Sequence, residues 1–330
     1  MGINARLDAL PGPMTWVGGR SVAAFRVAGV TGFWIALLVV TGGAVLSGHS
    51  PVVGLGLVVA CTAGSVLWAS LRRLATGRED LVQLEYVWLC PAVATGLLVV
   101  LGEPLAPWLD LVAIGLVCFL AAGRVGCLLA GCCHGHPSEV GTLVDDPAPA
   151  RGWPAVRVFP VPLLEAGCLA AVVPLAVVAL SLARSGAVAL ALGLVTAVLR
   201  LATDPLRGDR GRARLRRSGS YWMAGTQLFA VLVLADRWAT GGLRPVAVAA
   251  AGILFAAWLV VSAVRGEPTG VVSLVLVRET RAAAAAGRPV DVAGLGDEAL
   301  GRLARLAFGA PRPASADRRD YFRTQTGATP

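Results

Sequence analysis

The chain has 330 residues, of which 56% are hydrophobic and 15% are charged, and its formal net charge is +9. Soluble globular proteins carry about 25% charged residues, so the composition excludes that class and predicts a multi-pass membrane protein. All 29 basic residues are arginine, and no basic surface interleaved with aromatic residues is apparent. This pattern favours contact with anionic lipid headgroups and argues against nucleic acid as a partner.

Eight apolar segments approach the roughly 20 residues that a helix needs to cross a bilayer. They are rich in Ala, Gly, Val and Leu, which favours close packing of helices through small side chains. We therefore predict an all-α, polytopic membrane protein with seven to eight transmembrane helices. The predicted spans are 28–46, 52–71, 86–101, 105–122, 162–182, 187–201, 221–235 and 245–264.

The apolar segments divide the chain into three parts. Residues 1–27 form a polar N-terminal segment without the apolar core of a removable signal peptide, and residues 28–264 form the membrane domain. Residues 265–330 form a polar, arginine-rich tail that we expect to be partly disordered. Within this tail, residues 297–308 space their apolar side chains as one face of a helix. An amphipathic helix on the membrane or on a partner, or a solvated tail, are both compatible with this pattern.

The most unusual stretch of the chain covers residues 123–137, where an apolar segment runs into Arg124, three cysteines and two histidines. An arginine at the end of an apolar span costs free energy unless it meets an anion or a carboxylate. The neighbouring glycines allow a ligand or another helix to approach the backbone closely. We therefore interpret Arg124 as a functional residue.

Other ionisable residues lie in or near the ends of predicted spans. Two or three arginines face three carboxylates in this group, which predicts one shared polar cluster between helices. Structural explanations stay open: an interfacial carboxylate, a carboxylate at a helix N-terminus, and arginines that extend to the membrane surface. The residues are Asp110, Glu165, Arg200, Asp204 and Arg207.

The cysteines and histidines of this stretch invite a metal interpretation. Zinc sites usually combine two ligand pairs, with two to four residues between the cysteines of a pair. Here Cys132, Cys133 and His134 are consecutive and no second pair follows, so we expect no metal site. A disulfide from Cys127 to Cys132 or Cys133, a free thiol, or an imidazole acting as a base remain alternatives.

Together these motifs resemble those of the bacterial prolipoprotein diacylglyceryl transferases. Gly123-Arg124-Val125-Gly126, followed by Gly131 and Gly135, is similar to that family's Gly-Arg-Ile-Gly-Asn signature. The segment 159–165, which ends in Glu165, is similar to its Pro-x-Gln-Leu-Tyr-Glu segment. The spacing of Arg200, Asp204 and Arg207 follows its Arg-x-x-x-Glu-x-x-Arg pattern. Asp110 and the segment 225–227, which ends in Gln227, also match the family pattern.

The resemblance implies a transferase that moves the diacylglyceryl group of phosphatidylglycerol to a cysteine thiol of a lipoprotein precursor, without a cofactor. It further implies a multi-pass protein of the bacterial plasma membrane, whose partners are this anionic phospholipid and the precursor's signal peptide. The implied catalytic residues are Arg124, Arg200 and Asp204, and we add His134, or alternatively His136, as a replacement base. The implied substrate-binding residues are Arg207, Glu165, Gly126, Gly135, Gln227 and Asp110.

The chain also departs from the family pattern. Cys127 replaces the signature asparagine, Ala130 replaces the next asparagine, and Ala28 stands at an expected tyrosine. A His-Gly-Gly segment expected on the third span is absent from residues 84–92. These differences support an alternative function, a non-catalytic relative that binds phospholipid or a partner protein.

Overall fold

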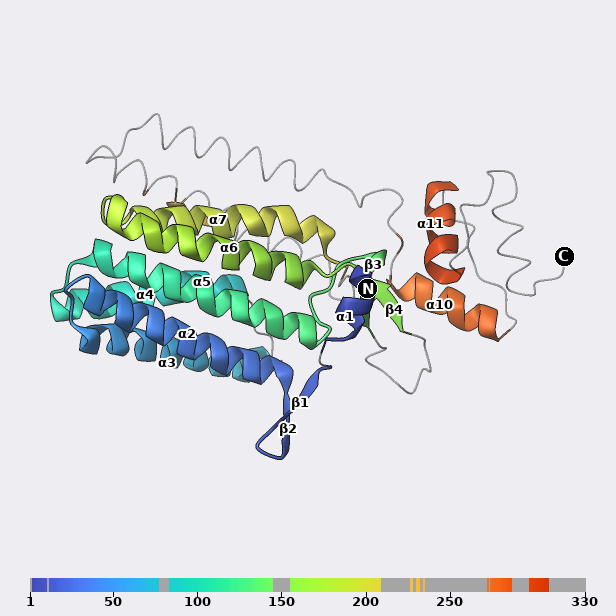
Figure 1. The fold of residues 1–330 in the computed structure, drawn as a ribbon, viewed down its shortest axis with the longest axis horizontal. Helices are drawn as coiled ribbons and strands as arrows, with labels where there is room; N and C mark the ends of the chain where they lie inside the picture. Colours follow the sequence, from blue (N-terminus) through green and yellow to red (C-terminus); the bar gives the residue numbers. More distant parts are fainter. Residues whose placement is uncertain are drawn as a thin grey trace.

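The computed structural model describes residues 2–10, 12–76, 83–144, 155–208, 274–286 and 297–308, together with residues 226, 227, 230, 231, 234 and 272. Six long helices of the described part lie side by side as a bundle (Figure 1). They are α2 (Ala24–Leu46), α3 (Pro51–Thr76), α4 (Gln83–Leu101), α5 (Leu105–Leu129), α6 (Val161–Leu182) and α7 (Ala187–Thr203).

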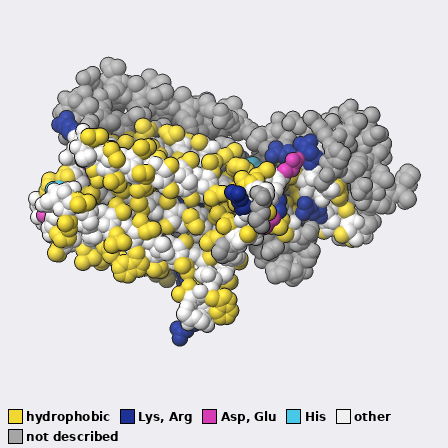
Figure 2. Space-filling model, viewed as in Figure 1, with side chains coloured by type: hydrophobic (Ala, Val, Ile, Leu, Met, Phe, Trp, Pro, Cys, Tyr) yellow, Lys and Arg dark blue, Asp and Glu magenta, His cyan; other side chains and the backbone are white. Residues whose placement is uncertain are grey.

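The bundle has the length and the surface of a membrane domain. Within the described residues, α2, α3, α5 and α6 are long and apolar enough to span a bilayer, and the apolar parts of α4 and α7 are shorter. Large hydrophobic side chains such as Trp34, Leu38 and Val100 are exposed on these helices. Figure 2 shows hydrophobic side chains over the visible face of the bundle. An apolar surface of this extent requires contact with lipid.

Helix α5 lies at the centre and packs against α2, α4, α6 and α7. Its contact with α2 is close because glycines alternate between the two helices. A Cβ atom on Gly115 would lie 2.7 Å from the Val40 side chain, and one on Gly32 would lie 2.9 Å from Ala122. The small residues noted in the sequence therefore permit the central helix pair to approach closely.

The helices match six of the eight predicted spans, with different ends. Helix α2 begins at Ala24 rather than at residue 28, and α5 continues past residue 122 to Leu129. Arg124 thus lies inside α5. The helix can include this residue because a carboxylate on α6 offsets its charge and no proline interrupts the segment. The predicted span 245–264 lies outside the described residues, as does most of 221–235.

Two small antiparallel sheets, which the sequence did not predict, accompany the helices. Strands β1 (Met14–Val17) and β2 (Arg20–Ala23) form a hairpin just before α2. Gly18 and Gly19 connect them, with φ values of 56° and 77°. A two-residue hairpin turn of type I′ requires positive φ at both of its central residues. Strand β3 (Pro137–Val144) pairs with β4 (Val156–Val158). Strands β1, β2 and β4 have four residues or fewer, and an irregular register between Pro137 and Thr142 interrupts β3, so none shows a sustained alternation of polar and apolar residues.

A small head region lies at one end of the bundle (Figure 1). It combines α1 (Ile3–Asp8), β3, β4, α10 (Leu274–Ala285) and α11 (Asp297–Phe308). The α11 bounds coincide with the predicted amphipathic helix. Its apolar side chains pack inside the chain, in a cluster with Val156 and Val277, so the tail helix finds its partner surface within the same protein.

Candidate active site

The site forms where α5, α6 and α7 meet near the head region. Arg124 of α5 and Glu165 of α6 are 4% and 3% exposed, and Arg124 Nε lies 2.6 Å from Glu165 Oε2. Because an unpaired buried charge is very costly, each residue supplies the counter-charge that the other needs. This ion pair joins the signature segment on α5 to the carboxylate on α6.

The end of α7 completes the charged cluster. Arg200 Nη1 lies 3.5 Å from Glu165 Oε1, and Arg200 Nη2 lies 3.3 Å from Asp204 Oδ1. The Thr203 hydroxyl donates a hydrogen bond of 2.6 Å to Glu165 Oε1. Two arginines thus share two carboxylates, whereas the sequence predicted one cluster with three carboxylates, and the third, Asp110, lies elsewhere. Thr203 was not predicted, and only its place one residue before Asp204 hints at its role.

A small cavity lies beside this cluster. Its volume is about 20 Å³, close to the space of one water molecule. Arg124, Glu165 and Arg200 line its polar side, and the other lining residues are Val87, Leu169, Thr196 and Leu199.

Gln227 lies next to the same cavity. It is 4% exposed, and its Nε2 donates hydrogen bonds to the Gly193 carbonyl at 2.8 Å and to Thr196 Oγ1 at 2.7 Å. Thr196 lines the cavity, so only this side chain separates Gln227 from it. The structure therefore brings this predicted residue to the site.

Backbone pairing places Arg207 beside residues 134–136. The Gly135 amide donates to the Phe159 carbonyl at 2.7 Å, and the His136 amide donates to the Leu206 carbonyl at 3.2 Å. A Cβ on Gly135 would lie 2.8 Å from the Phe159 carbonyl oxygen. Three chain segments approach so closely here that residue 135 has no room for a side chain. Arg207 pairs with Gly135 through an isolated β-bridge.

His134 is half-buried and its Nδ1 lies 2.9 Å from the Gly135 carbonyl oxygen. A carbonyl only accepts hydrogen bonds, so Nδ1 carries the proton in this contact. In the neutral imidazole, Nε2 is then the atom that can accept a proton. The local geometry therefore gives His134 the tautomer that a general base at Nε2 requires.

Two predicted substrate-binding residues make contacts within the helix bundle in this structure. Asp110 lies 14 residues before Arg124 on α5, which is about 21 Å along the helix. Its carboxylate accepts hydrogen bonds from the Gly186 and Ala189 amides at 2.6 and 2.7 Å, and so caps the start of α7. Gly126 faces Phe25 and Ala28 of α2, where a Cβ would lie 2.9 Å from the Ala28 Cβ.

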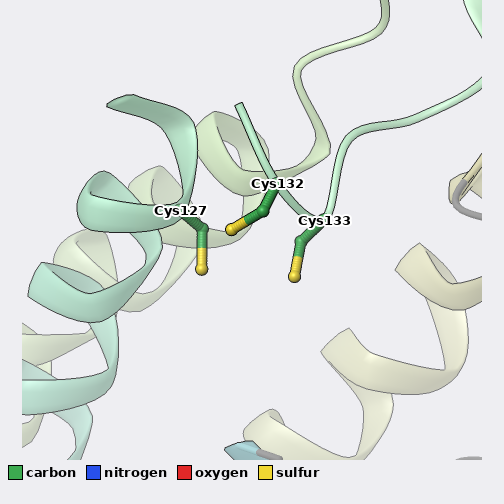
Figure 3. A group of neighbouring side chains, drawn as sticks. All are labelled: Cys127, Cys132 and Cys133. Atoms are coloured by element: carbon green, nitrogen blue, oxygen red, sulfur yellow. The ribbon is translucent and has the colours of Figure 1, made fainter. Parts of the chain in front are cut away.

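Three cysteines gather beside the charged cluster. Figure 3 shows Cys127 on the last turn of α5 and Cys132 and Cys133 on the segment that follows, with their sulfur atoms close together. Hydrogen bonds from the Cys127 and Cys132 thiols lower the pKa of Cys133, and the charges of Arg207 and Arg124 lower it further. Burial acts in the opposite direction. The cluster therefore favours a thiolate at Cys133.

Comparison with known proteins agrees with these observations. The family model of prolipoprotein diacylglyceryl transferases matches residues 89–258. The match includes the charged cluster and covers just over half of the chain. No curated protein matches the chain. Members of the matched family are membrane transferases that modify lipoproteins. The chain belongs to the prolipoprotein diacylglyceryl transferase family.

Proposed function

We propose that this protein transfers the diacylglyceryl group of phosphatidylglycerol to a cysteine thiol of a lipoprotein precursor. The observation that carries the proposal is the buried cluster of Arg124, Glu165, Arg200 and Asp204 beside a small cavity at one end of the bundle. Buried arginines at the end of a lipid-exposed bundle are suited to an anionic headgroup whose acyl chains stay in the membrane.

The reaction breaks the bond between the diacylglyceryl carbon and a phosphate oxygen and forms a carbon–sulfur bond. The leaving glycerol phosphate keeps the electron pair, so its oxygen gains negative charge in the transition state. Glu165 contacts Arg124 through Nε, and a phosphate would take the two terminal Nη groups, which bind phosphate as a fork. Arg200 and Arg207 add positive charge, while Glu165 and Asp204 hold the arginines in place.

The acceptor thiol must lose its proton because the thiolate is the nucleophile. We assign this proton to His134, whose Nδ1 contact with the Gly135 carbonyl leaves Nε2 as the basic atom. Gly135 and Gln227 position the segments around the cavity. The precursor's signal peptide would reach the site from the membrane, alongside the exposed apolar helices.

The test is transfer of labelled glyceride from phosphatidylglycerol to a cysteine peptide by the purified protein in nanodiscs. Arg124→Gln keeps the length and polarity of the side chain but removes its charge, and we expect a loss of transfer of at least about 100-fold. Arg184→Gln is the matched control, because Arg184 is exposed at the opposite end of the bundle. Equal activity of wild type and Arg124→Gln would refute the phosphate role.

The departures from the family pattern favour a second candidate function. Cys127 and Ala130 stand where the family signature has asparagines, so the chain could bind phospholipid without turnover. Phosphatidylglycerol that binds to wild type and not to Arg124→Gln, with no transfer by either protein, would support this alternative.

A further inference from the structure

The end of α5 sets two cysteines side by side. The Cys132 amide donates to the Cys127 carbonyl at 3.1 Å, and the Gly131 amide donates to the Leu128 carbonyl at 3.2 Å. Gly131 has φ of 67°. These are the features of a Schellman cap, in which the second residue after the cap packs against the third residue from the helix end. Those two positions are Cys132 and Cys127, so the cap itself brings their side chains together.

Cys133 joins them through an unusual backbone conformation. Its φ is 56°, which is uncommon for a residue other than glycine. The three sulfur atoms all lie within 4.8 Å of one another, as Figure 3 shows. In the part of the chain that the structure describes, this is the one group of three potential metal ligands at such distances.

The spacing of the sulfur atoms suits a shared metal ion. Two thiolates bound to one tetrahedral zinc ion at about 2.3 Å each lie about 3.8 Å apart, whereas a disulfide requires about 2.05 Å. Arg124 and Arg207 interact electrostatically with Cys133. A divalent ion and three thiolates have a net charge of −1, which these two arginines would offset. Cys127 is buried, Cys133 is half-buried and Cys132 is exposed, so an ion can reach the cluster from outside.

We propose that Cys127, Cys132 and Cys133 bind one thiophilic divalent metal ion, Zn²⁺, and leave its fourth position open. Three protein ligands with an open position are typical of zinc sites that act on a substrate. The consecutive cysteines argued against such a site in the sequence, because paired spacing is the usual signal. The Schellman cap supplies a different way to bring the ligands together.

The open position suggests a role for the metal in the proposed transfer reaction, on which this step depends. An acceptor cysteine thiol that binds zinc gives up its proton, here to His134, and stays as a thiolate. Its sulfur then attacks the diacylglyceryl carbon while the carbon–oxygen bond to phosphate breaks and glycerol phosphate leaves with the electron pair. Arg124 lines the cavity and also interacts electrostatically with Cys132 and Cys133. The proposed metal site and the proposed phosphate site therefore have this arginine in common.

Metal content tests the site without any transfer assay. The full chain is purified in detergent, loaded with Zn²⁺ and dialysed, and its metal is measured by mass spectrometry. We expect about one zinc ion per chain, with at least a tenfold lower affinity in Cys127→Ser, Cys132→Ser and Cys133→Ser. Cys168→Ser is the control, because Cys168 lies on α6 outside the cluster. Equal zinc in all variants, or zinc far below one per chain in wild type, overturns the proposal.

A second measurement on the unmutated protein avoids the risk that a variant fails to fold. Replacing zinc with Co²⁺ should produce an intense sulfur-to-cobalt absorption band, and a cysteine peptide should increase it as a fourth sulfur binds. A mass lower by two hydrogens, with two fewer reactive thiols, would identify a disulfide and overturn the proposal. Metal binding without transfer would refute the proposed function alone, and transfer by metal-free protein would refute the role of zinc in catalysis.

Discussion

Glu165 is the residue on which the charged cluster depends. One carboxylate contacts Arg124 and Arg200 and accepts a hydrogen bond from Thr203, and it is 3% exposed. Removing its charge leaves two arginines on separate helices with one fewer buried counter-charge. The position of Glu165 in the first turns of α6 is thus explained by cluster geometry, beyond any favourable effect on the helix N-terminus.

We expect Glu165→Gln to lower the free energy of unfolding by roughly 3–5 kcal/mol, because a buried charge loses its partner. Thermal unfolding of the purified protein in detergent measures this loss. The control is Glu139→Gln, whose side chain is 66% exposed in its pair with Arg305 and is therefore worth about 0–1 kcal/mol. Similar unfolding temperatures for the two variants would show that the cluster does not stabilise the bundle.

At the level of single elements, the α2–α5 contact explains some of the glycines on these two helices and not others. A Cβ on Gly126 would lie 2.9 Å from the Ala28 Cβ and 3.1 Å from the Phe25 ring. Gly123 is one turn earlier on the same helix, and a Cβ there would meet no atom within 4 Å. The same helix therefore contains a glycine that packing requires and one that packing does not.

Gly126→Ala should destabilise the protein by about 1–3 kcal/mol, since the added methyl group forces the helices apart. Gly123→Ala adds the same group in open space and should be neutral or stabilising by up to about 1 kcal/mol through helix propensity. Parallel thermal unfolding of the two variants gives the comparison. Equal destabilisation would mean that backbone freedom at the signature, and not the α2 contact, is what the glycines provide.

At the scale of the whole molecule, the head joins segments from both ends of the chain. The Arg157 guanidinium on β4 donates two hydrogen bonds to the Asp8 carboxylate on α1, at 2.9 and 2.8 Å. Arg281 on α10 donates to the Leu306 and Ala307 carbonyls at the end of α11 and to the Ala155 carbonyl before β4. Arg157 of β4 and Arg281 of the tail thus hold segments of the head together.

The contact between Asp8 of α1 and Arg157 of β4 should depend on pH. The hydrogen bonds from Arg157 lower the pKa of Asp8 below its ordinary value of 3.8. A lowered pKa means that the stabilisation is complete above that ordinary value and is lost as pH falls through the lower folded value. Hydrogen exchange of residues 3–8, corrected for intrinsic rates, should therefore increase between about pH 5 and about pH 3. Asp8→Asn should exchange quickly at both pH values; protection that persists in this variant would show that other contacts hold α1.

Local composition was sufficient for much of the fold. Hydropathy located α2 to α7, because apolar side chains must face lipid along any helix that spans a bilayer, and helical spacing located α11 to the residue. The order and spacing of Arg124, Glu165, Arg200 and Asp204 also indicated the family and a shared polar cluster. Hydropathy and helical spacing are read along a short window of the chain, and the family motifs are read from short segments and from their order in the sequence.

By itself, the sequence determined the membrane class, the helical segments described above, the family and most residues of the charged cluster. Only the tertiary structure decided that Asp110 caps α7 far from Arg124, that Gln227 adjoins the cavity, that three cysteines meet, and that the tail packs on β4. The physical reason is that these facts depend on distances between residues far apart in the chain or on backbone conformations at a helix end. Such distances follow from how the helices pack and turn, which no single window of the sequence contains.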